Sequence, residues 1–273
     1  MIEITPKQLL EYLEQYGTSV HCEMYINYKQ WYFGDVQLRA KFYYDRGCAI
    51  VVEEYEHEGK HHIRRSIHQT TPDADIDAVT EKWRVEAVDY AKKFENPEIT
   101  LLAFTVSNGE LPPEKDRFFG WRNYSRSGGK YTTDEYVREL TIKDSEIIQS
   151  ACKASMENDS RWGKQAADDF LNYDFEYNSG KSRIYGIFNE NILVGMAEIS
   201  HEEPLGLAWL KDILIIQSHR RKGFGKKLLL TILSDYPNIK WHYQAAKQNV
   251  ESVALAKSLG FTLEGAGLYI MPT

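Results

Sequence analysis

One segment near the carboxyl end joins an apolar strand to a basic, glycine-containing turn and then to a helix. Residues 213–216 are four aliphatic residues, three of them β-branched, which favours a buried strand. Gly223 and Gly225 follow where the chain must turn, and their missing Cβ atoms allow backbone N–H groups at the start of the next helix to surround an anion. The basic residues around them are Arg220, Arg221, Lys222, Lys226 and Lys227. The segment therefore predicts a phosphate-binding turn.

A second strand and helix follow downstream. The helix after the turn carries apolar residues at helical spacing from Phe224 to Leu233, and Tyr236-Pro237-Asn238 ends it. Residues 239–244 then predict a strand. Asn249 is expected to cap the next helix, and Gly260 is expected to end it.

These two elements carry a family resemblance. The spacing Arg220-x-x-Gly223-x-Gly225 resembles the pyrophosphate-binding signature of the GNAT superfamily of N-acetyltransferases. The run N-x-x-S-x-x-L-x-x-x-L-G-F, which starts at Asn249, is similar to the second signature of that superfamily. The resemblance covers about half of the chain, from about Tyr136 to the end. Chance remains the alternative, in which the turn is a solvated basic segment before an ordinary amphipathic helix.

The resemblance implies acetyl-CoA as the co-substrate. In the family, the sheet splays apart between the strand ending near Ile216 and the strand starting near Ile239, and the thioester arm lies in that gap. The residues that the resemblance assigns to the cofactor are Ile213, Leu214, Ile215, Arg220, Arg221, Lys222, Gly223, Phe224, Gly225, Lys226, Asn249 and Ser252.

The implied chemistry needs a proton acceptor, because an amine is protonated at neutral pH and must lose a proton before it attacks the thioester. Asp212 stands on the cofactor-contacting strand, where many family members place an acidic residue, and is the predicted catalytic residue. The alternative is a surface or salt-bridged strand residue. Glu198, Glu202 and Glu203 are further candidates. A backbone N–H near Leu214 or Ile215 is expected to polarise the carbonyl.

One position departs from the family pattern. Many relatives carry a Tyr four residues before the closing glycine of the second signature, as the acid that protonates the leaving thiolate. Here Ala256 occupies that position, and Tyr243 and Tyr269 are the alternatives. Because a thiolate is already a good leaving group, the departure affects the identity of the acid more than the activity.

The element order of the second half predicts a mixed α/β (α+β) sheet flanked by helices. Helices are expected from Asp144 and over residues 162–173, and residues 183–188 and 192–199 predict a hairpin about Asn189-Glu190-Asn191. The strands expected outside this hairpin cover residues 136–141, 208–216 and 261–271.

The first part of the chain predicts a separate, smaller α+β domain of unknown role, over residues 1–130, before an acetyltransferase domain over residues 131–273. Residues 125–130 are small and flexible, and are the expected linker. No internal repeat is visible. A helix with a capped start is expected at Thr5, strands over residues 19–26, 36–44, 48–55, 61–67 and 99–106, and a helix over residues 77–94.

Aromatic residues in this first part have two interpretations. Residues 31–33 and the pair Tyr43-Tyr44 either line a pocket for a cationic acceptor, together with Glu53-Glu54, or pack in the core. His57, His61 and His62 flank a glycine-containing turn among charged residues, where solvent exposure is expected rather than metal binding. No metal site is expected.

Composition argues against some classes of binding partner. The chain has 273 residues and a formal net charge of −7, which argues against a general nucleic-acid binder because phosphate contacts need a broad basic surface. No apolar run approaches membrane-spanning length and no signal peptide precedes Thr5, so no membrane partner is expected and the expected location is cytoplasmic. The scattered cysteines Cys22, Cys48 and Cys152 fit a reducing compartment.

The sequence thus predicts an acetyl-CoA-dependent N-acetyltransferase that acts on an amine of a small molecule or peptide by direct attack in a ternary complex. The two-part layout is also similar to bacterial GNAT proteins with an extra amino-terminal domain, including the zwittermicin-resistance acetyltransferases, which would imply a small amine. The alternatives are a non-catalytic acyl-CoA-binding or protein-interaction module and an acyl donor longer than acetyl. A homodimer is the expected form if the protein self-associates.

Overall fold

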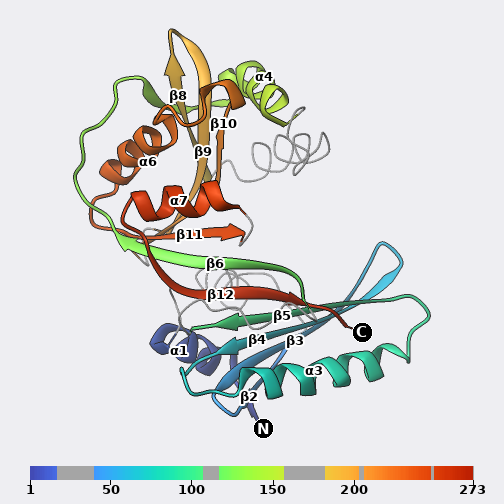
Figure 1. The fold of residues 1–273 in the computed structure, drawn as a ribbon. Coiled ribbons are helices and arrows are strands. Elements are labelled where there is room, and N and C mark those ends of the chain that lie inside the picture. Colours follow the sequence, from blue (N-terminus) through green and yellow to red (C-terminus); the bar gives the residue numbers. More distant parts are fainter. Residues whose placement is uncertain (17–39, 107–116, 157–181, 203–205, 247–248, 273) are drawn as a thin grey trace. The chain divides into compact units, whose positions relative to one another are not determined.

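The computed structural model describes residues 1–16, 40–106, 117–156, 182–202, 206–246 and 249–272 (Figure 1). The chain divides into two compact units. Unit 1 contains Met1–Tyr124, Gln244–Val253 and Thr262–Thr273, and unit 2 contains Ser125–Tyr243 and Ala254–Phe261. This division differs from the two contiguous domains expected from the sequence, because two segments near the carboxyl end group with the first unit.

Unit 1 is a mixed sheet with helices. Its strands lie in the order β1-β2-β3-β4-β5-β12-β6, with β4 and β5 parallel and the pairs from β1 to β4 antiparallel. The elements are β1 (Ile2–Ile4), α1 (Pro6–Tyr16), β2 (Ala40–Asp45), β3 (Cys48–His57), β4 (Lys60–Gln69), α3 (Ile76–Ala91), β5 (Pro97–Thr105), β6 (Arg117–Ser127) and β12 (Thr262–Ile270).

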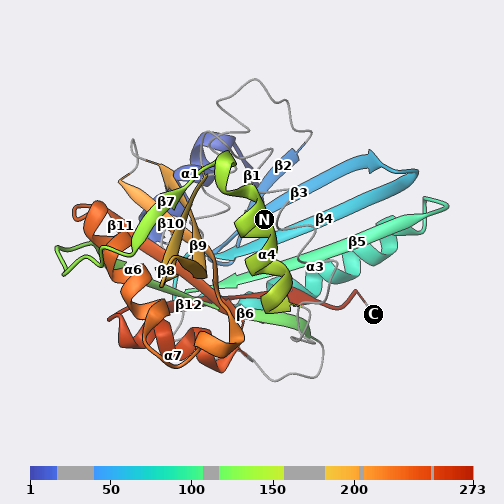
Figure 2. The same ribbon diagram turned by 90° about the horizontal axis from the view of Figure 1, so that it is seen from above.

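Local sequence signals explain the elements of unit 1. The Thr5 hydroxyl accepts from the Gln8 backbone N–H at 3.3 Å, and the Gln8 side chain accepts from the Thr5 backbone N–H at 2.8 Å, which confirms the predicted capped helix start. The β3–β4 turn places Glu58 and Gly59 at φ of 50° and 74°, as a two-residue hairpin requires. Helix α3 runs along one face of the sheet (Figures 1 and 2), where Trp83 is buried.

The described aromatic residues of unit 1 pack against other rings. The ring centroids of Tyr43 and Trp83 lie 5.3 Å apart, and Tyr44 stacks on Tyr12 at 4.4 Å. This favours the packing interpretation for Tyr43-Tyr44. Residues 31–33, the strand expected over residues 19–26 and the first part of the strand expected over residues 36–44 lie outside the described residues.

The histidines beside the β3–β4 turn also stack on rings. His62 stacks on Tyr55 with centroids 4.7 Å apart, and His61 stacks on Phe94 and pairs with Glu56. Within the described residues, no group of three or more His, Cys, Asp or Glu side chains is arranged to hold a metal ion.

The strands of unit 2 lie in the order β11-β10-β9-β8-β7, with β10 and β11 parallel and the other pairs antiparallel. Strand β11 and helix α7 each run from one unit into the other. Helices α4 and α6 lie on opposite sides of β8–β10 (Figure 1). The elements are β7 (Val137–Leu140), the 3₁₀ turn η2 (Ile142–Asp144), α4 (Ser145–Met156), β8 (Ser182–Asn189), β9 (Ile192–Glu202), β10 (Leu207–Ile215), the 3₁₀ turn η4 (Gln217–His219), α6 (Phe224–Asp235), β11 (Lys240–Ala246) and α7 (Val250–Ser258).

The structure confirms the mixed α/β fold class and most of the expected elements of unit 2. The β8–β9 turn places Glu190 and Asn191 at φ of 50° and 67°, as predicted for that hairpin. The helix expected over residues 162–173 lies outside the described residues. Among those that the structure does describe, no helix is both long and apolar enough to span a membrane.

The predicted linker is wrong for its first residues. Ser125 to Ser127 belong to β6, and the Gly128 N–H donates to the Ile239 carbonyl at 2.7 Å. A Cβ atom at Gly128 would lie 2.5 Å from the Tyr236 carbonyl oxygen. The small residues here therefore allow two stretches of backbone to approach closely, rather than giving a flexible connection.

Candidate active site

Strand β10 changes its pairing in the middle. Its parallel ladder with β11 runs from Leu207–Lys240 to Leu210–Tyr243. Directly after it, the register between β10 and β9 shifts between Leu210 and Asp212, so Lys211 is the extra residue of a β-bulge. In the described residues, β10 beyond the bulge pairs only with β9. The backbone groups on the edge that faced β11 therefore pair with no described strand beyond the bulge.

The backbone alternation of β10 decides which amides face this edge. The Ile216 N–H donates to the Val194 carbonyl of β9 at 3.0 Å. Since successive strand residues direct their N–H groups to opposite edges, the amides of Ile213 and Ile215 point away from β9. Of the two amides suggested by the sequence for polarising a carbonyl, that of Ile215 therefore faces the unpaired edge.

Side chains on β10 alternate between the two helices. Leu214 and Ile216 pack against the buried cluster that includes Ile148 of α4. A Cβ atom at Gly225 of α6 would lie 3.6 Å from Ile215 and 3.8 Å from Ile213. Asp212 precedes Leu214 by two residues, so its side chain lies on the α4 side of the sheet.

Asp212 lies beside a second carboxyl group and a lysine. It pairs across the ladder with Glu198 of β9, so both carboxyl groups share a face. Glu198 is fully buried, and its Oε1 accepts from the Lys211 ammonium at 2.8 Å. Its Oε2 has no hydrogen-bond partner among the described residues. The bulge makes the contact between the lysine and Glu198 feasible, because it breaks the alternation that would direct Lys211 to the other face.

This environment changes the acidity of Asp212. Burial and, to a smaller extent, the Glu198 charge raise the pKa of Asp212, whereas Lys211 lowers it, and the net result is a pKa of about 7. A carboxyl group with a pKa near neutral is suited to take a proton from an amine. Of the other candidate acids, Glu202 ends β9, and Glu203 lies outside the described residues.

The turn between β10 and α6 is built from two left-handed residues. Arg221 has φ of 61° and Gly223 has φ of 88°. Gly223 caps α6, and its carbonyl accepts from the Lys227 N–H at 3.0 Å. Among the described residues, no backbone carbonyl accepts from the backbone N–H groups from Arg221 to Lys226. Successive free N–H groups at a helix start form an anion-binding concavity.

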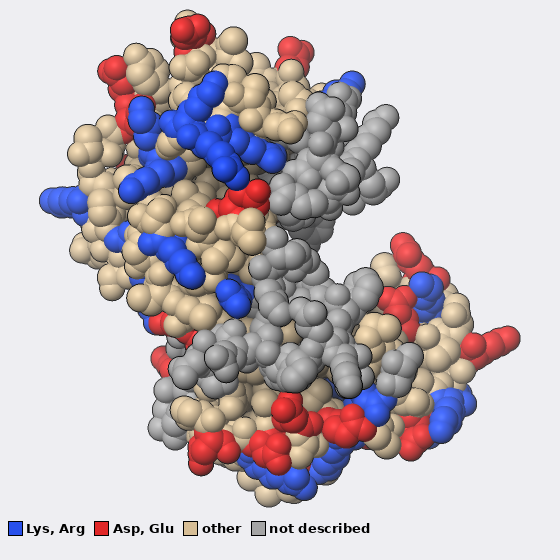
Figure 3. All heavy atoms as spheres, in the orientation of Figure 1, with Lys and Arg blue, Asp and Glu red and all other residues tan. Residues whose placement is uncertain are grey.

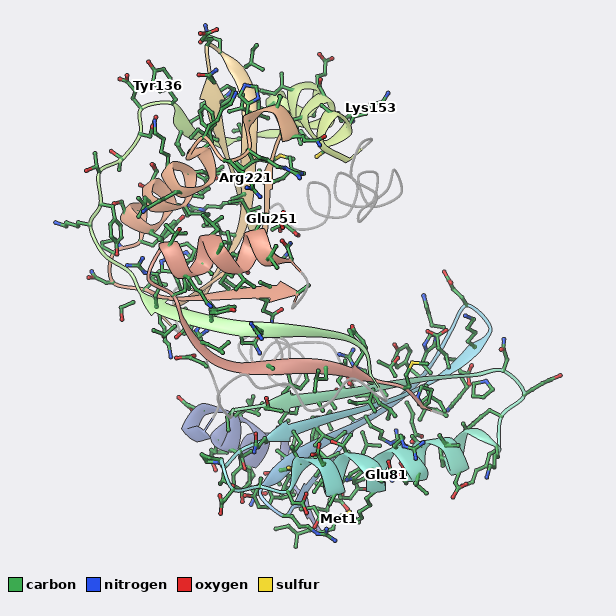
Figure 4. All side chains as sticks on the ribbon, in the orientation of Figure 1. Met1, Glu81, Tyr136, Lys153, Arg221 and Glu251 are labelled. Carbon is green, nitrogen blue, oxygen red and sulfur yellow. The ribbon has the colours of Figure 1, made fainter. Side chains whose placement is uncertain are left out.

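Charged side chains surround this turn. Arg221, Lys222 and Lys226 are exposed, and Figure 4 shows Arg221 beside the start of α6. Blue side chains gather on this unit in Figure 3. The Arg220 guanidinium donates to the Ile215 carbonyl at 2.9 Å, which ties the turn to the end of β10. The positive charge and the free amides therefore coincide.

The second signature folds as expected at both ends of α7. The Asn249 side chain accepts from the Ser252 N–H at 3.1 Å, and Gly260 has φ of 79° after the helix. Asn249 and Ser252 belong to unit 1, whereas the other predicted cofactor residues belong to unit 2. Ala256 is fully buried, and the space for a tyrosine ring there would require repacking.

Sequence reasoning missed Lys211. A lysine between Leu210 and Asp212 in an apolar strand is an unusual residue, and that is the only signal in the sequence. The bulge that aims it at Glu198 is a property of two paired strands.

Gly225 differs from Gly223 in what surrounds it, which gives a test. A Cβ atom at Gly225 meets its neighbours at ordinary contact distances of 3.5 Å or more. We expect Gly225→Ala to stabilise the protein by about 0.5 to 1 kcal/mol through helix propensity, with unchanged acetyl-CoA affinity. Thermal unfolding and calorimetric titration measure the two effects, and a large loss of affinity would show that the cofactor needs the space above Gly225.

Comparisons with known proteins agree with this geometry. The model of the acetyltransferase (GNAT) family matches residues 147–261. No curated protein matches the chain. A GCN5-related N-acetyltransferase from Sphaerobacter thermophilus has a similar fold, with a TM-score of 0.56, 10% identity and coverage of 98% of this chain and 93% of that one.

Two more solved structures have the same fold over nearly the whole chain. A tandem GNAT protein from the clavulanic acid biosynthesis pathway has a TM-score of 0.54 at 12% identity, covering 98% of this chain and 96% of its own. A GNAT-family acetyltransferase from Colwellia psychrerythraea has a TM-score of 0.52 at 14% identity, covering 98% of both chains. Residues 147–261 are therefore an acetyltransferase domain of the GNAT family.

Proposed function

We propose that the protein transfers an acetyl group from acetyl-CoA to an amine of a small molecule or peptide, by direct attack in a ternary complex. The observation that carries the proposal is the turn before α6, where no described backbone carbonyl accepts from the N–H groups from Arg221 to Lys226 and the basic side chains are exposed. A pyrophosphate offers the negative oxygens that such a turn binds.

The acceptor chemistry rests on Asp212. An amine reaching this carboxyl group as an ammonium ion would be attracted by Asp212 and by the unpartnered Oε2 of Glu198. Asp212 would take one proton, and the free amine would attack the thioester carbonyl. The tetrahedral intermediate would expel the CoA thiolate, and its charged nitrogen would give its extra proton to the thiolate or to solvent, which leaves the neutral amide. The Ile215 amide on the unpaired edge of β10 is placed to donate to the carbonyl oxygen as its charge develops.

The experiment that tests this function is the release of free thiol from acetyl-CoA across a library of amines. We expect amine-dependent release with acetylated product detected by mass spectrometry. Binding of acetyl-CoA without release for any amine would favour the non-catalytic binding module, which the buried Ala256 keeps as the second candidate. Faster release from longer acyl-CoA donors would correct the donor.

Substitutions of Glu198 and of Lys211 should shift the pH dependence of kcat/KM in opposite directions. Glu198→Gln removes a negative charge that raises the pKa of Asp212, so the acid limb of the kcat/KM profile should move to lower pH. Lys211→Met removes a positive charge that lowers this pKa, so the limb should move to higher pH. Shifts of the same sign, or none, would show that the limb does not report Asp212.

A double variant controls for stability. Lys211→Met alone leaves the buried Glu198 charge without its cation, which is expected to destabilise the fold by about 3 to 5 kcal/mol. Glu198→Gln combined with Lys211→Met removes both charges, and its acid limb should lie between those of the single variants.

A further inference from the structure

Unit 1 repeats the element order of unit 2. Each unit has a first strand and a helix, then three antiparallel strands, a helix and a strand parallel to the last of the three. The strand orders β1-β2-β3-β4-β5 and β7-β8-β9-β10-β11 are the same. Helix α3 thus corresponds to α6, and the pair β4–β5 corresponds to β10–β11. The family match at residues 147–261 does not include this first copy.

The two copies differ at the parallel pair. In unit 2 the ladder between β10 and β11 stops at Leu210–Tyr243, and β10 continues without it. In unit 1 the ladder between β4 and β5 runs without a register shift from His61–Pro97 to His68–Phe104. The Gln69 side chain then accepts from the Val106 N–H at 3.0 Å, which joins the ends of both strands. At the described β4–β5 pair, an extended thioester arm therefore has no unpaired strand edge to follow.

The turns before α3 and α6 have opposite charge. Asp73, Asp75 and Asp77 stand where the other copy has its basic residues, and the Asp75 side chain accepts from the Ala78 N–H at 3.1 Å. A carboxylate already occupies the helix start, so a pyrophosphate would meet repulsion rather than free amides. The turn also packs closely, since a Cβ atom at Gly47 would lie 2.7 Å from Ala74.

The two units also differ on the face of the sheet opposite α3 in unit 1 and opposite α6 in unit 2. In unit 2, Glu198 pairs with Asp212 across the ladder. In unit 1, the buried Glu53 pairs across β3 and β4 with Arg64, whose Nε lies 3.4 Å from the Glu53 carboxylate. Arginine stays protonated and cannot accept a proton from an amine. The first copy thus has a permanent cation, Arg64, at the strand position where unit 2 has Asp212.

We propose that unit 1 is a second copy of the acetyltransferase fold that has lost the donor site, so that the full chain binds one molecule of CoA rather than two. This inference rests on the proposed function of unit 2. Three independent differences each argue against a donor site in unit 1. They are the continuous β4–β5 ladder, the acidic capped turn before α3, and Arg64 at the position of the base.

Calorimetric titration of the full chain with CoA tests the stoichiometry. We expect one site per chain, binding weakened by at least about 30-fold in Gly223→Val, and no change in Asp73→Ala, which alters only the unit 1 turn. Two sites per chain, or a site that survives Gly223→Val and weakens in another unit 1 variant such as Gln69→Ala, would overturn the inference and leave the proposed function intact. No binding in the unmodified protein would overturn the proposed function and the inference with it.

Discussion

Asp212→Asn should lower kcat at neutral pH by about 100-fold, because it removes the group that accepts the proton of the attacking amine while keeping the size of the side chain. The loss should shrink at alkaline pH, where the amine loses its proton to solvent. Wild-type kcat/KM should rise through a pKa of about 7, and this limb should be absent in the variant. Rates measured from pH 5 to 10 test both statements.

Two controls separate this effect from damage to the fold. The affinity for acetyl-CoA should stay within about twofold of wild type in Asp212→Asn, since the carboxyl group lies on the α4 side of β10 and away from the turn. A variant with a normal rate and an unchanged profile would contradict the assignment of Asp212 and transfer the function to another residue or to water.

The raised pKa of Asp212 also predicts that the stability of the protein depends on pH. The pKa of Asp212 in the folded protein, about 7, exceeds its ordinary value of 3.8, so between these values the folded state binds more protons than the unfolded state. Its contribution to stability should fall as the pH rises from about 4 to 7. Asp212→Asn should remove this part of the decline, which melting temperatures at pH 5 and pH 8 would reveal.

Gly223→Val should weaken acetyl-CoA binding by at least about 30-fold, or about 2 kcal/mol. A valine side chain at this left-handed position would project where the anion approaches the free N–H groups, and the strain of φ at 88° would distort the turn. Calorimetric titration measures the affinity directly, with circular dichroism to confirm folding.

Gly59→Val is the matched control. Gly59 also has a left-handed φ, of 74°, and at both glycines no described atom lies within 4 Å of the position of an added Cβ. The two substitutions therefore introduce similar strain and similar bulk, but Gly59 lies in the β3–β4 hairpin. Equal effects on acetyl-CoA binding in the two variants would mean that strain, and not the phosphate turn, causes the loss.

The sequence determined the parts of this protein that depend on neighbouring residues. A stretch of about fifteen residues predicted β10, the turn and α6 from its glycines, its basic side chains and the spacing of its apolar residues. This was possible because turn conformation, helix caps and strand propensity depend on residues that are close in sequence. Asn249 and Gly260 predicted the ends of α7 for the same reason.

Only the tertiary structure decided which distant strands pair and where their register shifts. Strand β12 at the chain end pairs with β5, so Ala266 lies opposite Thr105, and no local signal specifies a partner that far along the chain. The bulge at Lys211, the buried Glu198 and the repeated topology of unit 1 likewise come from hydrogen bonds between strands. The sequence sets which segments form strands. The raised pKa of Asp212, in contrast, depends on the folded protein, because the burial of its carboxyl group and the nearby Glu198 charge exist only once the sheet is assembled.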